Sequence, residues 1–474
     1  MARYQEIADG IAALIASGTL RAGQRIPSVR KAAAMHKVSA GTVLQAFDQL
    51  EARGLIEARP QSGYYVRPQH AGLAPEPKST TPAARAMQLD VSELVFDVLE
   101  QIKHRELVPL GSAFPSPELF PLARLNRMAA AMARRQKPWS SLDDLPPGNA
   151  ELRHQIALRY MESACSVSPD DIVITCGALE AINLGLQAVT RPGDTVAIES
   201  PTFYSTLQAI ERLGLRAVEI PTHPRTGIEL ASLEAALKSQ SIKACVLITT
   251  FQNPLGACMP DENKAALVKL LKQHDVALIE DDVYAELYFD QQRPRPAKAF
   301  DKSGLVLHCG SFSKCLSPGY RVGWIAAGRY RAQVERIKLM TTLSTASLPQ
   351  ATIAEFLKHG AYERHLRHLR HTLASQCQEM MRAISQYFPN GCRMTRPSGG
   401  YMLWVELPKG IDALQLHRLA LAEGISIVPG PIFSAQRKYR NCVRLNFAYP
   451  WTTQLEKSVR KLGQLAASLK SAEK

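Results

Sequence analysis

The chain has 474 residues, of which 46% are hydrophobic and 21% charged, and it carries a formal net charge of +14. This composition is typical of a folded globular protein and excludes a disordered or collagen-like chain, and the length predicts more than one domain. No apolar run approaches the ~20 residues that a membrane span needs, and the N-terminus lacks the apolar stretch of a signal peptide, so we expect a cytoplasmic protein with no membrane partner. The nine cysteines form no C-x-x-C pair, which argues against a disulfide framework and a zinc site, so we expect no metal.

The first 66 residues predict three helices and a hairpin. Four apolar residues recur with helical spacing along the first helix: Ile7, Ile11, Leu14 and Ile15. Pro27 opens a second helix, and Ser39 caps a third. Four residues form the buried face of the third helix: Val43, Ala46, Phe47 and Leu50. Two β-rich runs, at residues 55–59 and 64–67, flank a turn, and the whole pattern is that of a winged helix-turn-helix.

The outward face of the third helix suggests DNA as a partner. Thr42, Gln45 and Gln49 point away from its buried face, and Ser39 leaves free backbone N–H groups at the helix start, where phosphate oxygens bind well. Basic residues surround this helix start: Arg25, Arg30, Lys31 and Lys37. The alternative is a small three-helix cap without a DNA role.

Three motifs of this domain resemble the GntR family of bacterial repressors. They are G-x-x-x-x-G-x-x-I-P-S-x-R at residues 18–30, V-S-x-x-T-V at residues 38–43 and S-G-x-x-V at residues 62–66. The resemblance covers residues 3–66. It implies that DNA is contacted by Arg30, Ser39, Thr42 and the wing around Gly63.

Residues 67–88 divide the chain once. This segment contains four prolines and no apolar period. Proline has a fixed φ and no backbone N–H, so the segment cannot form a continuous helix and is expected to be an extended, semi-stiff linker. The sequence therefore predicts an N-terminal domain at residues 1–66 and a large domain at residues 89–474.

The large domain alternates helical stretches with short β-rich apolar runs. The runs lie at residues 171–175, 195–200, 243–249, 276–282 and 305–310. This alternation predicts an α/β fold with a mostly parallel sheet wrapped by helices. Because ligands bind at the C-terminal ends of the strands in such sheets, the residues that follow each run are the candidates for a site.

A set of hydrogen-bonding groups follows these runs. It comprises the backbone N–H groups of Ala178 and Leu179 and the side chains of Asn253, Asp281, Tyr284, Ser311, Ser313, Lys314 and Arg321. Each group alone has an ordinary explanation, such as a turn, a helix cap or a solvated loop lysine. Together they supply what pyridoxal phosphate needs: a lysine for its aldehyde, a carboxylate for its ring nitrogen, and hydroxyls, N–H groups and an arginine for its phosphate.

The order and spacing of these groups resemble the fold-type I aminotransferases from about residue 110 to about residue 468. The resemblance implies a mostly parallel sheet and a smaller C-terminal α+β subdomain. It also implies that Lys314 is the catalytic residue, bound to the cofactor's aldehyde carbon, and that Asp281 pairs with the pyridinium nitrogen. Asn253 and Tyr284 then bind the 3-hydroxyl of the ring.

The same resemblance implies roles for the remaining groups. Five residues would hold the phosphate: Ser311, Ser313, Arg321, Ala178 and Leu179. Phe203 would stack on the ring, with its neighbour Tyr204 as the alternative. Arg444 is placed to bind the α-carboxylate of a substrate as a bidentate pair.

A GntR-like domain, a proline-rich linker and an aminotransferase-like domain in this order resemble the MocR subfamily of bacterial transcription regulators. The resemblance implies DNA as a partner, a homodimer formed through the large domain, and bound pyridoxal phosphate that senses an amine or amino acid. Two alternatives stay open. One is a working aminotransferase whose DNA-binding domain is vestigial, and the other is a regulator that senses pyridoxal phosphate itself.

Overall fold

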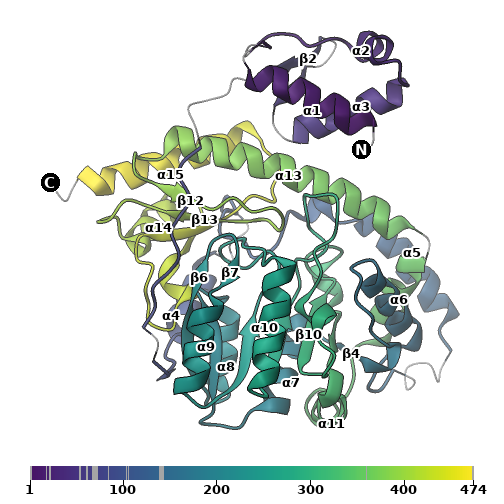
Figure 1. The fold of residues 1–474 in the computed structure, drawn as a ribbon, viewed down its shortest axis with the longest axis vertical. Coiled ribbons are helices and arrows are strands. Elements are labelled where there is room, and N and C mark those ends of the chain that lie inside the picture. Colours follow the sequence, from purple (N-terminus) through teal and green to yellow (C-terminus); the bar gives the residue numbers. More distant parts are fainter. Residues whose placement is uncertain are drawn as a thin grey trace.

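The structure is a computed structural model, and it describes residues 3–17, 19–20, 23–52, 55–59, 62–66, 73–83, 85–102, 104, 106–137, 144–358 and 360–471. We call residues 3–66 the reader, residues 73–83 the strap and residues 89–471 the body. In Figure 1 the reader lies above the body, beyond the long helix α13 (Ala361–Tyr387). Helix α3 of the reader (Ala40–Ala52) contacts α13. Among the described residues, no helix is long and apolar enough to cross a membrane.

The reader folds as three helices and a hairpin. Its elements are α1 (Arg3–Ala16), α2 (Val29–His36), α3, β1 (Ile56–Arg59) and β2 (Gly63–Val66). The two strands pair antiparallel, with Ile56 opposite Val66. The predicted buried face of α3 is confirmed, because Val43, Ala46, Phe47 and Leu50 are inaccessible to solvent. These residues belong to a core formed by reader residues alone.

One residue of the predicted face of α1 is placed wrongly by the sequence pattern. Ile7, Ile11 and Ile15 are buried, whereas Leu14 is 43% exposed. Each residue advances about 100° around the helix axis, so Leu14 falls about 20° short of the direction of Ile7. Ile11, Ile15 and Ala8 all lie past Ile7 in the opposite sense, and all three are buried. The buried arc therefore runs from Ile7 to Ala8 and leaves Leu14 at its edge.

The body is built on a nine-stranded sheet with the order β3-β6-β5-β8-β9-β10-β11-β4, to which β7 adds by pairing with β6. The strands are β3 (Met87–Gln88), β4 (Ile172–Thr175), β5 (Thr195–Ser200), β6 (Arg216–His223), β7 (Gly227–Ile228), β8 (Ile242–Leu247), β9 (Ala277–Asp281), β10 (Val306–Ser311) and β11 (Gly323–Ala326). Neighbours from β6 to β10 are parallel, while β3 and β11 pair antiparallel with theirs. The predicted α/β fold with a mostly parallel sheet is confirmed, and all five β-rich runs form strands. Strands β6 and β11 were not among the predicted runs.

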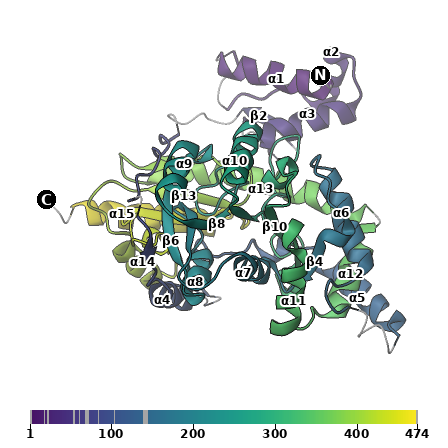
Figure 2. The ribbon, with the colours of Figure 1, turned by 60° about the horizontal axis from the view of Figure 1, so that its bottom comes forward.

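Helices cover both faces of this sheet. The helices of the body are α4 (Ser92–Ile102), α5 (Leu122–Arg135), α6 (Ala150–Met161), α7 (Ala178–Val189), α8 (Tyr204–Arg212), α9 (Leu230–Ser239), α10 (Asp261–Gln273), α11 (Arg331–Thr341), α12 (Ser347–Lys358), α13, α14 (Ala413–Ala422) and α15 (Thr453–Ser471). Side chains alternate along the central strands, so Ile198 and Ile279 pack with α7 and α8 while Ala197 and Leu278 pack with α9 and α10. Figure 2 shows α7 and α8 on the side of the sheet away from the reader.

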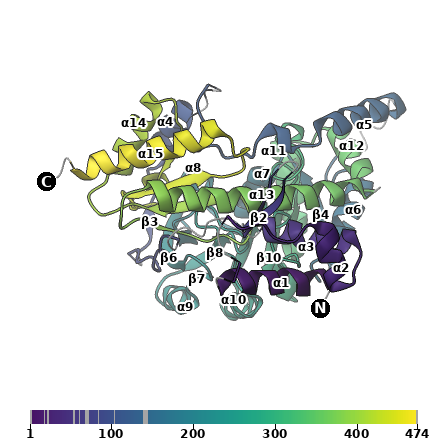
Figure 3. The ribbon, with the colours of Figure 1, turned by 90° about the horizontal axis from the view of Figure 1, so that it is seen from above.

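A smaller C-terminal subdomain completes the body. It has a four-stranded antiparallel sheet of β12 (Arg393–Met394), β13 (Met402–Glu406), β15 (Cys442–Asn446) and β14 (Val428–Pro429), in that order. Helices α13 and α15 pack against each other beside it, and Figure 3 shows α13 running along most of the length of the body. The expected C-terminal α+β subdomain is therefore present.

The strap is held against the body by hydrogen bonds. The N–H of Ala74 donates to Ser385 Oγ (3.1 Å), the N–H of Met394 donates to the carbonyl of Pro75 (2.9 Å), and Glu76 forms an ion pair with Arg225. The sequence predicted an extended linker and gave no sign of this docking. Residues 67–72 and 84 of the predicted linker lie outside the described residues, and residues 87–88 at its end form the edge strand β3.

Candidate functional site

The predicted DNA-contacting residues lie at the helix-turn-helix and the wing of the reader. Ser39 caps α3, since its Oγ accepts a hydrogen bond from the N–H of Thr42 (3.2 Å) and lies 2.9 Å from Thr42 Oγ1. Arg30 is on the exposed side of α2. Gly63 begins β2 with φ of +100°, and a Cβ there would lie 3.2 Å from the Arg25 guanidinium. Glycine is needed at this position because few other residues adopt such a φ.

The predicted cofactor residues other than Asn253 converge on one cavity of about 210 Å³ in the body, and Asn253 is bonded to the lining residue Tyr284. Its lining includes Ala178, Leu179, Phe203, Asp281, Tyr284, Ser311, Ser313, Lys314 and Arg321. They meet because the strands β9 and β10 and the turn after β4 all end at the same edge of the sheet. Ala113 and Phe114 also line the cavity, and no sequence pattern pointed to them.

Lys314 is partly buried and lines this cavity. Its Nζ donates a hydrogen bond to the carbonyl of Ala113 (2.8 Å) and lies 3.9 Å from the centre of the Phe114 ring. Burial, and then the positive charge of Arg444, lower the pKa of Lys314 to about 7, although the carboxylate of Asp281 acts in the opposite direction. A lysine in this state supplies a neutral amine, which is the nucleophilic form, near neutral pH.

Asp281 is the last residue of β9, and its side chain is buried at the cavity. Burial, and then the neighbouring carboxyl group of Asp282, raise the pKa of Asp281 to about 7. Its Oδ1 is buried and has no hydrogen-bond partner among the described residues. An unpaired buried oxygen is costly, so this atom is suited to a ligand that brings a proton to it.

The second acid of the motif, Asp282, has a different role. Its Oδ2 lies 2.9 Å from His308 Nε2, His308 Nδ1 lies 2.7 Å from the hydroxyl of Tyr160, and Trp324 Nε1 donates to that hydroxyl (2.9 Å). The Tyr160 hydroxyl accepts a hydrogen bond from Trp324, so the proton of this hydroxyl is available to His308 Nδ1. A neutral His308 then carries its own proton on Nε2, which faces Asp282. This buried chain occupies Asp282 and leaves Asp281 to the cavity. Sequence reasoning missed the chain because its members are far apart in the sequence.

Asn253 and Tyr284 form a pair beside Asp281. Asn253 Nδ2 donates to the hydroxyl of Tyr284 (3.2 Å), and Asn253 Oδ1 is buried without a partner among the described residues. Burial raises the pKa of Tyr284, so the phenol stays protonated. The pair therefore presents one hydroxyl and one free amide oxygen to a ligand.

The turn between β4 and α7 and the turn after β10 form an anion cradle. The first N–H groups of α7, at Ala178 and Leu179, have no partner within the helix. Arg321 Nη1 donates to Ser313 Oγ (3.2 Å), its Nη2 donates to the carbonyl of Cys176 (2.9 Å), and the hydroxyls of Ser311 and Ser313 lie 3.0 Å apart. Free N–H groups, two hydroxyls and a guanidinium in one place suit a phosphate.

An ion pair between Glu180 and Lys338 stabilises the turn between β4 and α7. Glu180 Oε2 accepts the N–H of Cys176 and lies 3.0 Å from Lys338 Nζ, which is 1% exposed. This contact ties α7 to α11. Neither Glu180 nor Lys338 was singled out from the sequence, because a charged residue inside a helical stretch normally indicates a solvated face.

Phe203 and Tyr204 both line the cavity, with ring centres 4.6 Å apart. Phe203 is partly exposed, whereas Tyr204 is buried and packs on Phe433. The geometry thus favours Phe203 as the ring that a ligand would cover, and its stacking role stays a prediction.

Arg444 is fully buried on β15 of the C-terminal subdomain. Its Nη2 donates to the carbonyls of Gly111 (2.6 Å) and Ser112 (3.2 Å), while its Nε and Nη1 have no partner among the described residues. Two free donors on one guanidinium match the two oxygens of a carboxylate. The unpaired buried atoms of Asp281, Asn253 and Arg444, together with the amine of Lys314 and the cradle, fit pyridoxal phosphate and an amino-acid carboxylate.

Two family models match separate parts of the chain. Residues 126–462 match the family model of aminotransferase class I and II, and residues 3–66 match that of the bacterial regulatory proteins of the gntR family. Two uncharacterized HTH-type transcriptional regulators of Escherichia coli (strain K12) are similar over almost their whole length. YdcR is 46% identical over 98% of this chain and 99% of its own, and YjiR is 38% identical over 98% of each.

Solved structures similar to the body include aminotransferases. The kynurenine aminotransferase of Pyrococcus horikoshii, in complex with PMP, has a TM-score of 0.74 at 29% identity, covering 80% of this chain and 95% of its own. The α-aminoadipate aminotransferase LysN of Thermus thermophilus, complexed with N-(5'-phosphopyridoxyl)-L-leucine, has a TM-score of 0.72 at 30% identity, covering 81% of this chain and 100% of its own. The chain therefore belongs to the aminotransferase class I and II family and, because a gntR-type reader precedes that body, to the HTH-type transcriptional regulators of MocR-like architecture.

Proposed function

We propose that this regulator binds pyridoxal phosphate in the body cavity, senses an amine or amino acid there, and passes the change to DNA through the reader. The division that we propose is a reader domain at residues 1–66, a linker at residues 67–88 and an effector domain at residues 89–474. One observation carries the proposal. A partly buried lysine, a buried carboxyl group and an anion cradle meet in one cavity, in a chain whose residues 3–66 match the gntR family.

Each cavity residue has a task in this proposal. Pyridoxal phosphate supplies an aldehyde that combines with amines and a ring that withdraws electrons when its nitrogen is protonated. Asp281 would hold the proton at that ring nitrogen, and Asn253 and Tyr284 would bond the 3-hydroxyl. The phosphate is held by Ala178, Leu179, Ser311, Ser313 and Arg321.

Lys314 and Arg444 are the residues that meet the effector. Lys314 would hold the cofactor through its amine, and it is the residue with which an incoming amine would compete for the aldehyde carbon. Arg444 binds the carboxylate of an amino acid through Nε and Nη1, and this favours amino acids over simple amines. Phe203 covers the ring and excludes water from that face.

The reader binds DNA in this proposal through Arg30, Ser39, Thr42 and the wing at Gly63. Effector binding changes DNA affinity only if the effector has different affinities for two arrangements of the chain. The contact of α3 with α13 and the docked strap are the links between reader and body that would differ between them.

We also propose that two chains form a homodimer through the body. Leu179 (45% exposed) and Phe114 (38% exposed) lie at the cavity, and Leu339 and Met340 are exposed on α11, which packs against α7. A cluster of exposed apolar side chains is typical of an interface.

A second function is favoured by the free donors of Arg444. The site has the groups that an aminotransferase uses on an amino acid, so the body is chemically equipped for transamination, and the reader would then be vestigial. A third reading is a regulator that senses pyridoxal phosphate itself and needs no amine.

The substitution Lys314→Ala separates these functions. The full-length variant should lose the yellow absorbance of bound cofactor and its response to amines, and it should still shift DNA from the region upstream of its own gene in a gel assay. Lys302→Ala removes an exposed lysine and is the matched control. A variant that keeps the absorbance, or a wild-type protein that forms keto acid rapidly and shifts no DNA, contradicts the proposal.

A further inference from the structure

A second cavity, of about 300 Å³, lies between the strap and the C-terminal subdomain. One wall is formed by residues 77–81 of the strap, and the opposite wall by β12, β13 and residues 438–442. Among the described residues, it shares no lining residue with the cofactor cavity. Its volume is at the lower end of the range for small-molecule sites.

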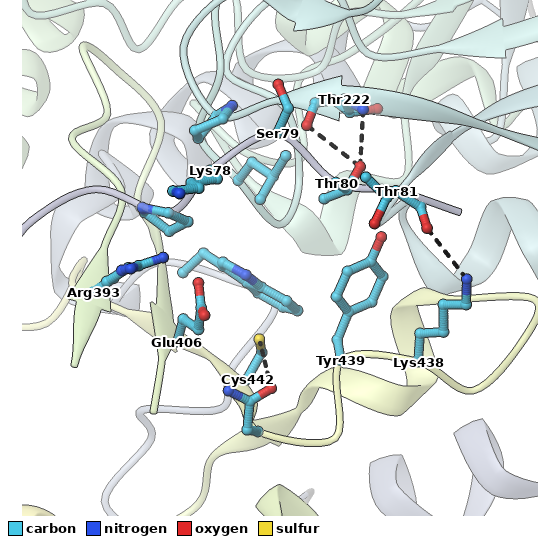
Figure 4. Close-up of a pocket in the computed structure, with 15 residues that line it drawn as sticks. Lys78, Ser79, Thr80, Thr81, Thr222, Arg393, Glu406, Lys438, Tyr439 and Cys442 are labelled. Carbon is cyan, nitrogen blue, oxygen red and sulfur yellow. Dashed lines mark hydrogen bonds between the residues drawn. The ribbon is translucent and has the colours of Figure 1, made fainter. Parts of the chain in front are cut away.

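The charged side chains of this second cavity are mostly cationic. Lys78, Arg393 and Lys438 line it, and Glu406 is the one acidic lining residue among those that the structure describes. In the view of Figure 4, Lys78, Arg393 and Glu406 lie at one end, and Lys438 at the other, where its Nζ donates to the carbonyl of Thr81 (3.4 Å). An anion is the natural partner of such a lining, since cations that share a cavity repel each other.

Two of these cations have no protein partner to neutralise them. Within the described ranges, neither Lys78 nor Arg393 makes an ion pair or side-chain hydrogen bond. Arg393 is directly opposite Glu406 in the antiparallel pair of β12 and β13, so a salt bridge between them would be easy to form, yet none exists. Both guanidinium and ammonium donors are therefore free for a ligand.

The middle of the cavity is apolar and aromatic. Trp404 and Tyr439 contribute rings that meet edge to face, with centres 5.9 Å apart, and Leu255 and Pro77 add apolar surface. A lining of apolar walls with a few convergent donors is typical of a site for a small organic molecule rather than for a bare ion.

We propose that this cavity, which nothing in the aminotransferase-like chemistry requires, binds a small organic phosphate between Lys78 of the strap and Arg393 of the body. The guanidinium of Arg393 and the ammonium of Lys78 hold the phosphate, and the rings of Trp404 and Tyr439 contact the organic part. The ligand bridges strap and body, so its binding fastens the linker that carries the reader.

The strap also contacts a segment that leads to the cofactor cavity. Thr80 Oγ1 donates to the carbonyl of Ser200 (2.6 Å) and accepts the N–H of Thr222 (2.9 Å), and Ser200 Oγ lies 2.7 Å from the Tyr439 hydroxyl. Ser200 is three residues before Phe203, which lines the first cavity. A ligand that fixes the strap thus also fixes the start of the segment that leads to Phe203, and coupling between the two cavities is reciprocal.

The test is calorimetric titration of full-length protein with phenyl phosphate, and with inorganic phosphate in a second arm. The protein is first saturated with pyridoxal phosphate and reduced with borohydride, which keeps the titrant out of the cofactor cavity. Failure to take up the cofactor is visible in the absorption spectrum and contradicts the proposed function alone. We expect saturable binding, tighter for phenyl phosphate than for inorganic phosphate.

Two variants and one control assign the binding to this cavity. Lys78→Gln and Arg393→Gln should each weaken phenyl phosphate binding by about 10-fold or more, as expected for loss of a charge-assisted hydrogen bond. Arg396→Gln should leave it unchanged, because Arg396 is exposed three residues further along and does not line the cavity. The absence of saturable binding, equal affinity for the two titrants, or unchanged affinity in both variants overturns the proposal.

Trypsin gives a second readout that depends on the strap. The bond between Lys78 and Ser79 is a trypsin site, and bound phenyl phosphate should slow its cleavage in the wild-type protein, as measured by mass spectrometry. In Arg393→Gln the protection should disappear while the strap sequence is intact. Equal cleavage rates with and without saturating ligand overturn the bridging role.

Discussion

The charge state of Lys314 is set by its surroundings, and this gives a prediction at the scale of single residues. Burial disfavours the ammonium, Arg444 repels it, and the pKa of Lys314 is lowered to about 7. The neutral amine reacts with an aldehyde, so the rate of pyridoxal phosphate uptake by the apoprotein should rise with pH and reach half its maximum near pH 7, well below the ~10.4 of a free lysine. Stopped-flow absorbance over pH 5.5–9.5 measures it.

A variant pair checks the cause of that shift. Arg444→Met removes the repelling charge, so the pKa of Lys314 should rise and the midpoint of the uptake profile should move to higher pH. Arg440→Met removes an exposed arginine of the same segment that pairs with Asp412, and its profile should match the wild type. A wild-type rate that still rises tenfold per pH unit at pH 9 would falsify the assignment.

Asp281 and Asp282 show why neighbouring residues of the same type differ in role. Asp282 Oδ2 is bonded to His308, and the Oδ1 atoms of both acids are buried without a partner among the described residues. Of the two, it is Asp281 that lines the cofactor cavity. The side chains of consecutive strand residues point to opposite faces. The resemblance assigns the ring nitrogen to Asp281, and the engagement of Asp282 with His308 is consistent with that prediction.

The turn between β4 and α7 carries a prediction at the scale of an element. Gly177 has φ of +90°, and a Cβ there would lie 2.6 Å from Arg321 Nη2. Gly177→Ala should therefore displace Arg321 from the cradle and weaken pyridoxal phosphate binding by about 10-fold or more, in addition to backbone strain of roughly 1–2 kcal/mol. Equilibrium titration of the apoprotein with the cofactor measures the affinity.

A substitution at a second glycine distinguishes the effect of backbone strain from the effect of displacing Arg321. Gly193 has φ of +91° and nothing within 4 Å of an added Cβ. Gly193→Ala should lower the melting temperature by a similar amount and leave cofactor affinity unchanged. If both variants bind the cofactor as the wild type does, Arg321 has no part in holding the phosphate.

Elements also differ in how far the sequence predicts them. The buried strands β5, β8, β9 and β10 are continuous apolar runs, and these are readily predicted. β11 is short and antiparallel, and its Gly323 lies too close to Gly177 and Gly310 for any side chain. It pairs with the nearby β10 on one side and with the distant β4 on the other, and a strand of four residues that begins with glycine has too little local periodicity to be predicted.

At the scale of the whole molecule, the separate cores of reader and body predict two unfolding transitions. Phe47 is inaccessible to solvent in a core built from reader residues alone, and its ring meets that of Tyr64 edge to face with centres 4.9 Å apart. Phe47→Ala should destabilise the reader by about 3–5 kcal/mol and lower its transition by more than ~10 °C. Differential scanning calorimetry should show the body transition unmoved.

A matching substitution in the core of the body should lower the body transition and leave the reader transition unmoved. Phe356 is 1% exposed in the core of the body, and Phe356→Ala should lower only the body transition. A single transition that moves with either substitution would mean that reader and body unfold as one unit.

The proposed homodimer is tested at the same scale. We expect a dimer in sedimentation equilibrium, and Met340→Glu, which puts a charge on the exposed apolar part of α11, should shift it toward monomer. Leu419→Glu changes an exposed leucine of α14 and is the control. Wild-type protein that sediments as a monomer at all concentrations contradicts the proposal.

The sequence by itself determined the features that depend on near neighbours. Apolar residues with a period of 2 or 3.6 predict the reader core and the apolar strands, because such a period acts within one element. The polar groups that follow the strands are read directly from short motifs. For this reason Phe47 and Leu50 were predicted to be buried, and Asp281 and Lys314 were predicted to meet at one edge of the sheet.

Only the tertiary structure decided the features that depend on contacts between distant segments. Ala113 meets Lys314 across 201 positions, and Thr80 meets Thr222 across 142. A proline-rich stretch has the same local pattern whether it is free in solvent or docked on a surface. The sequence therefore could not predict the docking of the strap or the second cavity beside it. Docking is decided by which surfaces the folded body offers to it, and those surfaces exist only once the distant strands have come together.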